Sequence, residues 1–301
     1  MQYRILGRTG LRVSEIGIGG AQFGIKDYMG RWDPDAPEAQ RTVEETIHRA
    51  LELGYNYFDT APAYGEGRSE EMMGRALRGH RDEVIIATKV SAGHWSPAEI
   101  RQSVEASLKR LQVDVIDVIQ FHGGWYNQGE DEVILRQGGL DAFQELREQG
   151  KVRFLGFTAE GPSGGVERLI ASGAFDVMQI RYNIMYQHPS DWENNQGVIR
   201  QADALRMGIV LMRPLTSGVF QRLMTKAFPH LSKADLSRFC LNYVLSDPYV
   251  DVALVGVRDP RLVEVNNAIS DDVASRLDLA EVHYRFARPR EPGKPERPAK
   301  R

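Results

Sequence analysis

The feature that most constrains the fold of this chain is a repeated alternation of short apolar runs with segments of helical periodicity. The apolar runs, rich in β-branched residues, occupy residues 16–18, 55–59, 84–89, 116–122, 152–157, 177–182, 209–212 and 252–257. The segments between and after them have the periodicity of helices and lie near 40–53, 69–78, 97–111, 139–149, 163–172, 195–206, 232–245 and 259–269. This pattern predicts eight strand-and-helix units.

Strands that alternate with helices predict parallel pairing, because each pair of parallel neighbours needs a crossover connection. The runs are almost purely apolar, as expected of strands that are buried on both faces. Eight units of this kind suggest that the sheet closes into a (β/α)8 TIM barrel. We therefore expect an α/β protein with one barrel domain over residues 1–286.

The two ends of the chain differ from this pattern. Residues 3–13 alternate apolar and polar side chains on both sides of the segment Gly7–Gly10, which predicts a β-hairpin that closes the bottom of the barrel. Residues 287–301 are rich in Pro, Arg and Lys and have almost no apolar side chains. This composition predicts a disordered tail.

Composition excludes several classes of protein. The chain has 38 Lys and Arg against 41 Asp and Glu, a formal charge of −3, which disfavours a nucleic-acid partner. The single cysteine, Cys240, excludes an internal disulfide, and the seven histidines lack metal-ligand spacing, so no metal site is expected.

The sequence has no signal-like N-terminus and no apolar run near the roughly 18 residues that a membrane span needs. We therefore expect a cytoplasmic protein without membrane contact.

Polar residues end three successive predicted strands. Asp59, Lys89 and His122 follow apolar runs, and Tyr64 lies five residues after Asp59 in a turn rich in Pro and Gly. The carboxyl ends of barrel strands share one rim, where barrel enzymes place their chemistry. Each residue alone has a structural explanation, but four together favour an active site.

These four side chains suit proton transfer to a carbonyl oxygen. A tyrosine hydroxyl starts from a pKa of about 10, some 3 units above neutrality, which is roughly 4 kcal/mol. An ammonium about 4 Å away at an effective dielectric near 20 supplies about 4 kcal/mol. Asp59 would keep Lys89 charged, and His122 would hold the carbonyl oxygen near Tyr64.

At these residues the sequence resembles the aldo-keto reductase family. The likeness covers about residues 1–270 and rests on Leu6–Ser14, Phe58–Ala61, Ala63–Gly65, Thr88–Lys89, Gln120–His122, Gly150–Gly156, Gln179–Asn183 and Gly256–Asn266. It implies a catalytic tetrad in which Tyr64 is the general acid, Lys89 and Asp59 lower the pKa of Tyr64, and His122 orients the substrate. It also implies a nicotinamide cofactor, because no protein side chain can deliver a hydride.

The resemblance implies that NADP(H) is the cofactor, with NAD(H) as the alternative. The residues that would bind it are Thr158, Gln179, Met212 and Arg213 near the nicotinamide, and Gly256, Arg258, Arg261 and Asn266 near the phosphates and adenine. The chain departs from the family pattern at Ala159, Met212 and Leu262, where an asparagine, an aromatic residue and a polar or basic residue are usual.

Aromatic residues in the predicted loops suggest the kind of substrate. Phe23, Tyr28, Trp32, Trp95 and Trp125 follow predicted strands, and such a pocket would suit an apolar or flat carbonyl compound or the face of a sugar. We expect an oxidoreductase that interconverts an aldehyde, ketone or sugar carbonyl with its alcohol. The alternatives are a nucleotide-binding regulatory or channel-associated subunit with little turnover, and a barrel enzyme that uses Lys89 as a Schiff-base nucleophile. The sequence fixes neither the physiological direction nor the oligomeric state.

Overall fold

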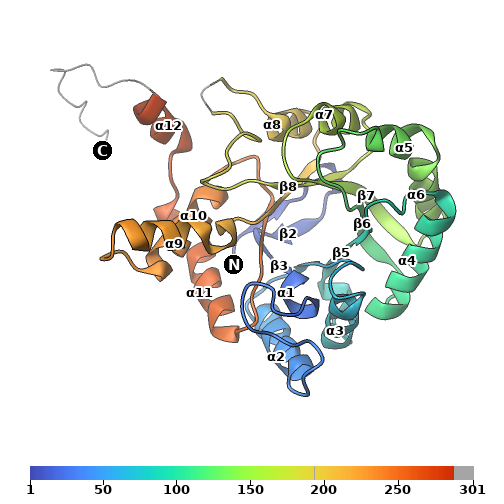
Figure 1. Ribbon diagram of the computed structural model, residues 1–301, viewed down its shortest axis with the longest axis horizontal. Helices are drawn as coiled ribbons and strands as arrows, with labels where there is room; N and C mark the ends of the chain where they lie inside the picture. The colour runs from blue at the N-terminus through green and yellow to red at the C-terminus, as the bar shows by residue number, and fades with distance from the viewer. Residues whose placement is uncertain (193, 288–301) are drawn as a thin grey trace.

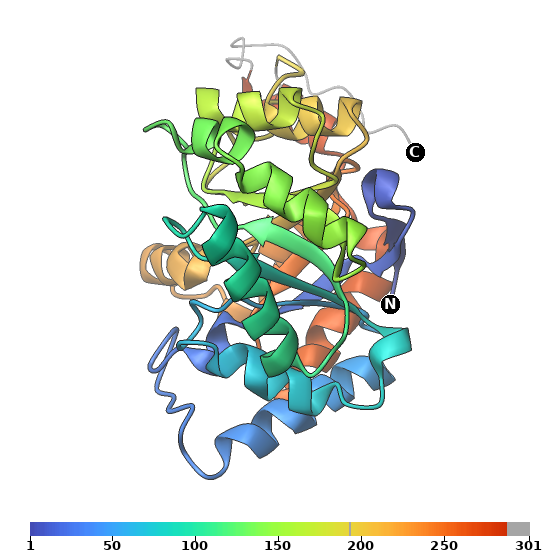
Figure 2. The same cartoon turned by 90° about the vertical axis from the view of Figure 1, so that its right-hand side faces the viewer.

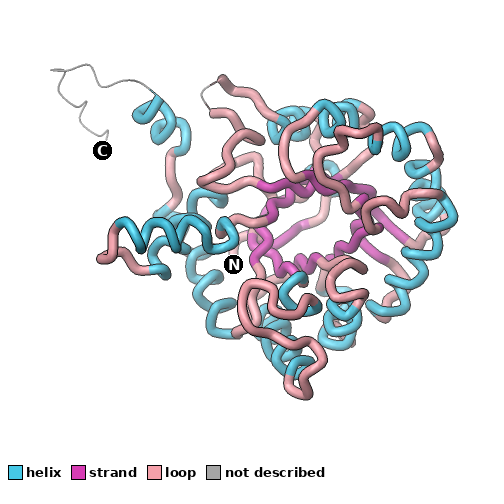
Figure 3. Tube along the Cα trace, in the orientation of Figure 1, coloured by secondary structure: helices cyan, strands magenta, loops and turns pink. Residues whose placement is uncertain are grey.

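A closed barrel of eight parallel strands forms the centre of the computed structural model, which describes residues 1–192 and 194–287 (Figure 1). The strands in chain order are β3 Ile16–Gly19, β4 Tyr57–Asp59, β5 Ile85–Val90, β6 Ile116–Phe121, β7 Val152–Ala159, β8 Val177–Arg181, β9 Gly208–Met212 and β10 Val252–Val255. β3 pairs with β10 in parallel, which closes the ring seen in Figure 3. The predicted TIM barrel is confirmed.

All eight predicted helices are present and surround the ring. They are α2 Ala39–Glu52, α3 Arg68–Ala76, α4 Pro97–Leu111, α6 Gly139–Glu148, α7 Gly164–Ala171, α8 Val198–Ala204, α10 Lys233–Leu245 and α11 Pro260–Asp271. Their ends differ from the predicted ends by a few residues at most. α4 starts as predicted because Ser96 and Glu99 form a reciprocal capping box in front of Pro97.

Further short helices lie in the connections, and the last of them lies after the barrel. They are α1 Ala21–Gly24, α5 Glu130–Arg136, α9 Val219–Ala227 and α12 Leu279–Ala287, and the 3-10 turns are η1 Gly7–Thr9, η2 Arg81–Glu83, η3 Thr216–Gly218 and η4 Val273–Ser275. The sequence pattern did not predict α1, α5, α9 or α12. α1 and α9 matter for function because both contribute to the cavity described below.

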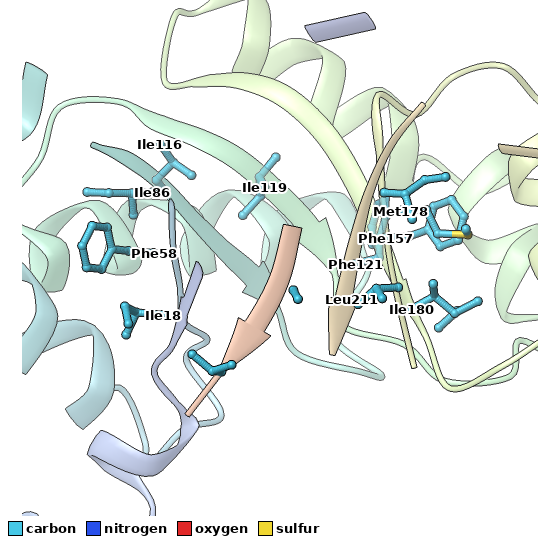
Figure 4. Packing of buried hydrophobic residues seen from close by; sticks show 14 of the residues in the cluster. Ile18, Phe58, Ile86, Ile116, Ile119, Phe121, Phe157, Met178, Ile180 and Leu211 are labelled. Carbon is cyan, nitrogen blue, oxygen red and sulfur yellow. The ribbon is translucent and has the colours of Figure 1, made fainter. Parts of the chain in front are cut away.

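Side chains alternate between the two faces of each barrel strand. Outward-facing residues such as Phe58, Ile119 and Met178 pack against the surrounding helices (Figure 4), and burying one such side chain contributes about 1.5–3 kcal/mol. Inward-facing residues such as Tyr57 and Val118 fill the barrel interior. The same period of two directs the polar residues near the strand ends into the barrel mouth, above this apolar layer.

The N-terminal hairpin closes the bottom of the barrel as predicted. β1 Tyr3–Ile5 and β2 Arg12–Ser14 pair antiparallel, with Tyr3 opposite Ser14, at one end of the barrel (right in Figure 2). Leu6 is fully buried and packs with the inward-facing side chains. At Gly7 an added Cβ would lie 2.2 Å from the backbone nitrogen of Gly208, so the hairpin backbone touches the base of β9.

The tail predicted for residues 287–301 lies, beyond Ala287, outside the described residues. In residues 1–192 and 194–287, no helix has both the length and the apolar character that crossing a bilayer requires.

Candidate active site

Lys89 and Asp59 form a buried ion pair at the mouth of the barrel. Lys89 Nζ donates hydrogen bonds to Asp59 Oδ1 and to the Thr60 carbonyl oxygen, each at 2.7 Å. Burial acts to lower the pKa of Lys89, but Asp59 and Tyr64 outweigh it and hold that pKa above its ordinary value. Lys89 is therefore an ammonium near neutral pH, which disfavours a role as a Schiff-base nucleophile.

Tyr64 and His122 complete the predicted group of four. Their rings lie edge to face with centroids 5.8 Å apart, and Lys89 Nζ is 5.0 Å from the centroid of the Tyr64 ring. Burial raises the pKa of Tyr64 and Lys89 lowers it by less, so the pKa of the hydroxyl stays above its ordinary value. The lowering effect that we expected from Lys89 is present, but burial outweighs it in the protein alone.

His122 is neutral in this setting. Burial, together with the nearby Lys89 ammonium, lowers the pKa of His122 to about 3. A neutral imidazole carries one N–H group, so it can donate one hydrogen bond to an oxygen held near Tyr64.

The turn that carries Tyr64 is held against α1 by direct contact between two backbones. Gly65 has φ +68°, and an added Cβ there would lie 2.0 Å from the Gly24 carbonyl oxygen. The Tyr64 carbonyl oxygen accepts a hydrogen bond from Ser69 N at 3.1 Å at the start of α3. Glycine is needed at both contact positions, and this contact fixes the backbone that places the Tyr64 ring over the barrel mouth.

A cavity of about 660 Å³ opens over the four residues and extends to α9 and α10. At one end it is lined by Tyr64 and His122 and by Gln22, Ile25, Tyr28 and Met29 from the segment after β3. At the other end it is lined by Ser217, Gln221 and Arg222 near α9, and by Lys233 and Ser237 of α10. The volume of the cavity is therefore larger than a small carbonyl substrate requires.

Five of the residues predicted to bind the cofactor line this cavity: Thr158, Gln179, Met212, Arg213 and Gly256. The Thr158 hydroxyl exchanges two hydrogen bonds of 3.0 Å with the backbone of Gly123. The guanidinium of Arg213 forms two contacts of 3.1 Å with the carboxylate of Glu160, so Arg213 is already paired.

The other three predicted cofactor residues are not among those that line the cavity in the described part of the chain. Arg258 Nη1 donates to the Gln22 carbonyl oxygen at 2.9 Å, and its guanidinium carbon lies 4.8 Å from the Trp32 ring centroid. Arg261 pairs with Asp259 at 2.8 Å, and Asn266 is buried in α11. Their contacts to a cofactor remain predictions.

Among the aromatic residues predicted for the substrate, Tyr28 lines the cavity, and Phe23, Trp32, Trp95 and Trp125 do not. Phe23 and Trp95 are buried in the core, where Trp95 packs on Phe121 and Tyr126. Trp32 donates its indole N–H to the Phe23 carbonyl oxygen at 2.7 Å, and Trp125 is 41% exposed. Their large apolar area is used mostly in packing, since burial of such rings is favourable wherever the core can accept them.

Several residues that line the cavity were not predicted from the sequence. Glu160 follows β7, and Ser217, Arg222 and Lys233 surround the far end. The segment after β9, Arg213–Gly218, offered a signal, because a polar turn with glycine before a helix favours an anion at the helix N-terminus.

No cluster of three or more His, Cys, Asp or Glu side chains suited to a metal ion occurs in residues 1–192 and 194–287.

Comparisons with known proteins identify the family of this chain. The model of the aldo/keto reductase family matches residues 15–283. The aldo-keto reductase YhdN of Bacillus subtilis (strain 168) is 29% identical over 329 residues, covering 94% of this chain and 93% of that protein.

Solved structures also match over nearly the full length. An aldo-keto reductase of Bacillus halodurans in its holo form is 26% identical with a TM-score of 0.74, covering 95% of this chain and 96% of that one. An aldo/keto reductase of Klebsiella pneumoniae, solved with NADP and acetate, is 21% identical with a TM-score of 0.72, covering 97% and 98%. The family model spans most of the chain, and the barrel with its group of four residues is in place, so this chain belongs to the aldo/keto reductase family of oxidoreductases.

Proposed function

We propose that this enzyme interconverts an aldehyde, ketone or sugar carbonyl with the corresponding alcohol, using NADP(H), with Tyr64 as general acid in reduction and general base in oxidation. The observation that carries this proposal is the position of Tyr64, which shares the cavity with His122 and lies beside the buried Lys89 ammonium. A proton donor next to a fixed positive charge suits a reaction that leaves a phenolate behind.

The cavity has the groups that a dinucleotide needs. Gln179 and Thr158 offer amide and hydroxyl groups close to the catalytic end, and Arg222 and Lys233 offer positive charge at the far end for phosphates. NADPH bound along this cavity would supply the hydride from C4 of its nicotinamide. The cofactor named for the Klebsiella pneumoniae enzyme supports this assignment.

The residues of this chain would handle the proton. In reduction, the carbonyl carbon gains the hydride and the carbonyl oxygen takes the proton of the Tyr64 hydroxyl. The neutral His122 would donate a hydrogen bond to the same oxygen and orient it. The Tyr64 phenolate that remains is stabilised by Lys89, which Asp59 and the Thr60 carbonyl hold in place.

NADPH oxidation over a panel of aldehydes, ketones and sugars tests the proposal. The Tyr64→Phe variant should lose about 10²- to 10⁴-fold in kcat/KM, whereas Tyr28→Phe, which removes a hydroxyl from the same cavity, should keep most of its activity. Equal activity of wild type and Tyr64→Phe would overturn the assignment of the acid. Tight NADPH binding without turnover of any substrate would favour the nucleotide-binding subunit instead.

A further inference from the structure

A buried amide beneath the cavity has no part in the proton transfer just described. Gln120 lies on β6, is fully buried, and is not among the residues that line the cavity. Its Nε2 donates to Asp59 Oδ2 at 3.3 Å and to Gln179 Oε1 at 3.1 Å. One side chain thus joins the carboxylate of the Lys89–Asp59 pair to an amide at the edge of the cavity.

The orientation of the Gln120 amide is determined by its neighbours. Both atoms that face its nitrogen, Asp59 Oδ2 and Gln179 Oε1, are hydrogen-bond acceptors. A rotated amide would place an oxygen against a carboxylate oxygen, which is repulsive. The Gln120 Oε1 atom itself is buried and has no hydrogen-bond partner in the described part of the chain. That oxygen costs folding free energy, which an apolar side chain of similar size would avoid.

The neighbouring strand leaves room for this side chain. Gly156 on β7 lies opposite Gln120 in the register. A Cβ at Gly156 would lie 3.1 Å from Gln120 Cγ and 2.8 Å from the Val177 carbonyl oxygen. The absence of a side chain at Gly156 therefore lets Gln120 reach across the barrel interior from β6 toward β4 and β8.

We propose that Gln120 is a positioning residue that fixes the Gln179 amide and the Asp59 carboxylate together, and so couples recognition of the nicotinamide carboxamide to the proton-transfer pair. This inference rests on the proposed function. Because Gln120 occupies Gln179 Oε1, the NH2 group of Gln179 is the part that faces elsewhere: one of its N–H groups serves the Asp59 carboxylate, and the other is left to donate to a carbonyl oxygen in the cavity. By donating to Asp59 Oδ2, it leaves Asp59 Oδ1 directed at Lys89.

The test is a double-mutant cycle on NADPH binding, followed by quenching of protein fluorescence. Gln120→Leu should weaken binding by about 2- to 10-fold, the effect of one neutral hydrogen bond, because the Gln179 amide then loses the donor that holds its oxygen and keeps only its contact with Asp59. If Gln120 acts through Gln179, the double variant with Gln179→Leu should bind no more weakly than Gln179→Leu alone. Additive losses, or unchanged binding by Gln120→Leu, would overturn the inference.

A matched control separates positioning from general packing. Gln40 on α2 also has a buried, unpartnered Oε1 in the described part of the chain, and its Nε2 donates to Glu44 at 2.8 Å, away from the cavity. Gln40→Leu should leave the Kd for NADPH unchanged. An equal loss of affinity in Gln40→Leu and Gln120→Leu would show that Gln120 acts only on stability.

Further results separate the positioning role of Gln120 from a folding defect and from the proposed function itself. Should Gln120→Leu fail to fold, Gln120→Met carries the same comparison with a more flexible side chain. Wild-type protein that does not bind NADPH would refute the proposed function itself and this inference with it. Wild-type protein that binds NADPH, with a Gln120 variant that binds equally well, would refute only the positioning role.

Discussion

Replacing Lys89 by methionine tests how much the buried ammonium contributes to catalysis. Lys89 Nζ lies 5.0 Å from the centroid of the Tyr64 ring. At an effective dielectric near 20, a unit charge at this distance stabilises the phenolate by about 3 kcal/mol. Removing the charge therefore raises the pKa of Tyr64 further, on top of the rise that burial already causes.

Alcohol oxidation is the direction that reports this change, because it needs Tyr64 as a base. Burial holds the pKa of Tyr64 above its ordinary value, so the phenolate is the minor species, and losing about 3 kcal/mol of stabilisation lowers its population on the order of 100-fold. The phenolate that remains is a stronger base, so the net loss in the rate of NADP⁺-dependent alcohol oxidation should be about 10- to 100-fold. The measurement is kcat for an alcohol substrate at fixed pH in wild type and Lys89→Met.

The variant also leaves the Asp59 carboxylate buried without its partner. Breaking a buried ion pair in this way costs about 3–5 kcal/mol of stability, which chemical denaturation can measure. The double variant Asp59→Asn with Lys89→Met removes both charges and should recover much of this stability, but not the activity. Alcohol oxidation within twofold of wild type in the folded double variant would refute the reasoning.

Three further perturbations test other parts of the structure. Burial lowers the pKa of His122 to about 3, so this group alone should cost wild type about 1.4 kcal/mol of stability per pH unit as the pH falls from about 6.5 toward 3. Urea denaturation of His122→Gln should show a smaller loss over that range. Gly65→Ala should lower both the melting temperature and kcat because its Cβ would strike the Gly24 carbonyl oxygen, whereas Gly79→Ala, with φ +88° and open space, should cost only about 1 kcal/mol and no activity. Phe121→Ala should cost about 3–5 kcal/mol in denaturation experiments, because the ring is fully buried in an aromatic cluster; a loss below about 1 kcal/mol would contradict the packing.

The barrel was predictable because its signal is local and repeated. Each apolar run is long enough to read as a buried strand, and caps such as Ser96 mark where a helix begins. α9 was missed for a physical reason. Its fully buried residue, Gln221, is polar, while its apolar residues Phe220 and Met224 are half-buried and Val219 and Leu223 are exposed, so its apolar stripe is short and partly uncovered. α9 borders the cavity, and the position of a helix beside a cavity cannot be read from the periodicity of its sequence.

The site was predictable where it follows from strand ends and not where it depends on packing. Asp59, Lys89 and His122 face the mouth because strand periodicity and a shared rim place them there. The direction of Trp95 depends on rings at Phe121 and Tyr126, which no local pattern reveals.

Two further residues differ in how far the sequence could have revealed them. The partner of Arg258 is the backbone of Gln22, more than 200 residues away in the chain. Gln120 could have been found, since it lies two residues after the inward-facing Val118 and two before His122.

The pairing of β3 with β10 has a consequence for how the protein is made in the cell. Residues 16–18 hydrogen-bond to residues 253–255, so the first barrel strand lacks one of its two neighbours until most of the polypeptide has left the ribosome. The growing chain therefore carries an unsatisfied strand edge throughout most of translation, and such edges recruit other chains. Ribosomal truncation before Val252 should yield an open sheet that aggregates, and chaperones that shield nascent strands should matter more for this enzyme than for a protein whose first strand is paired early.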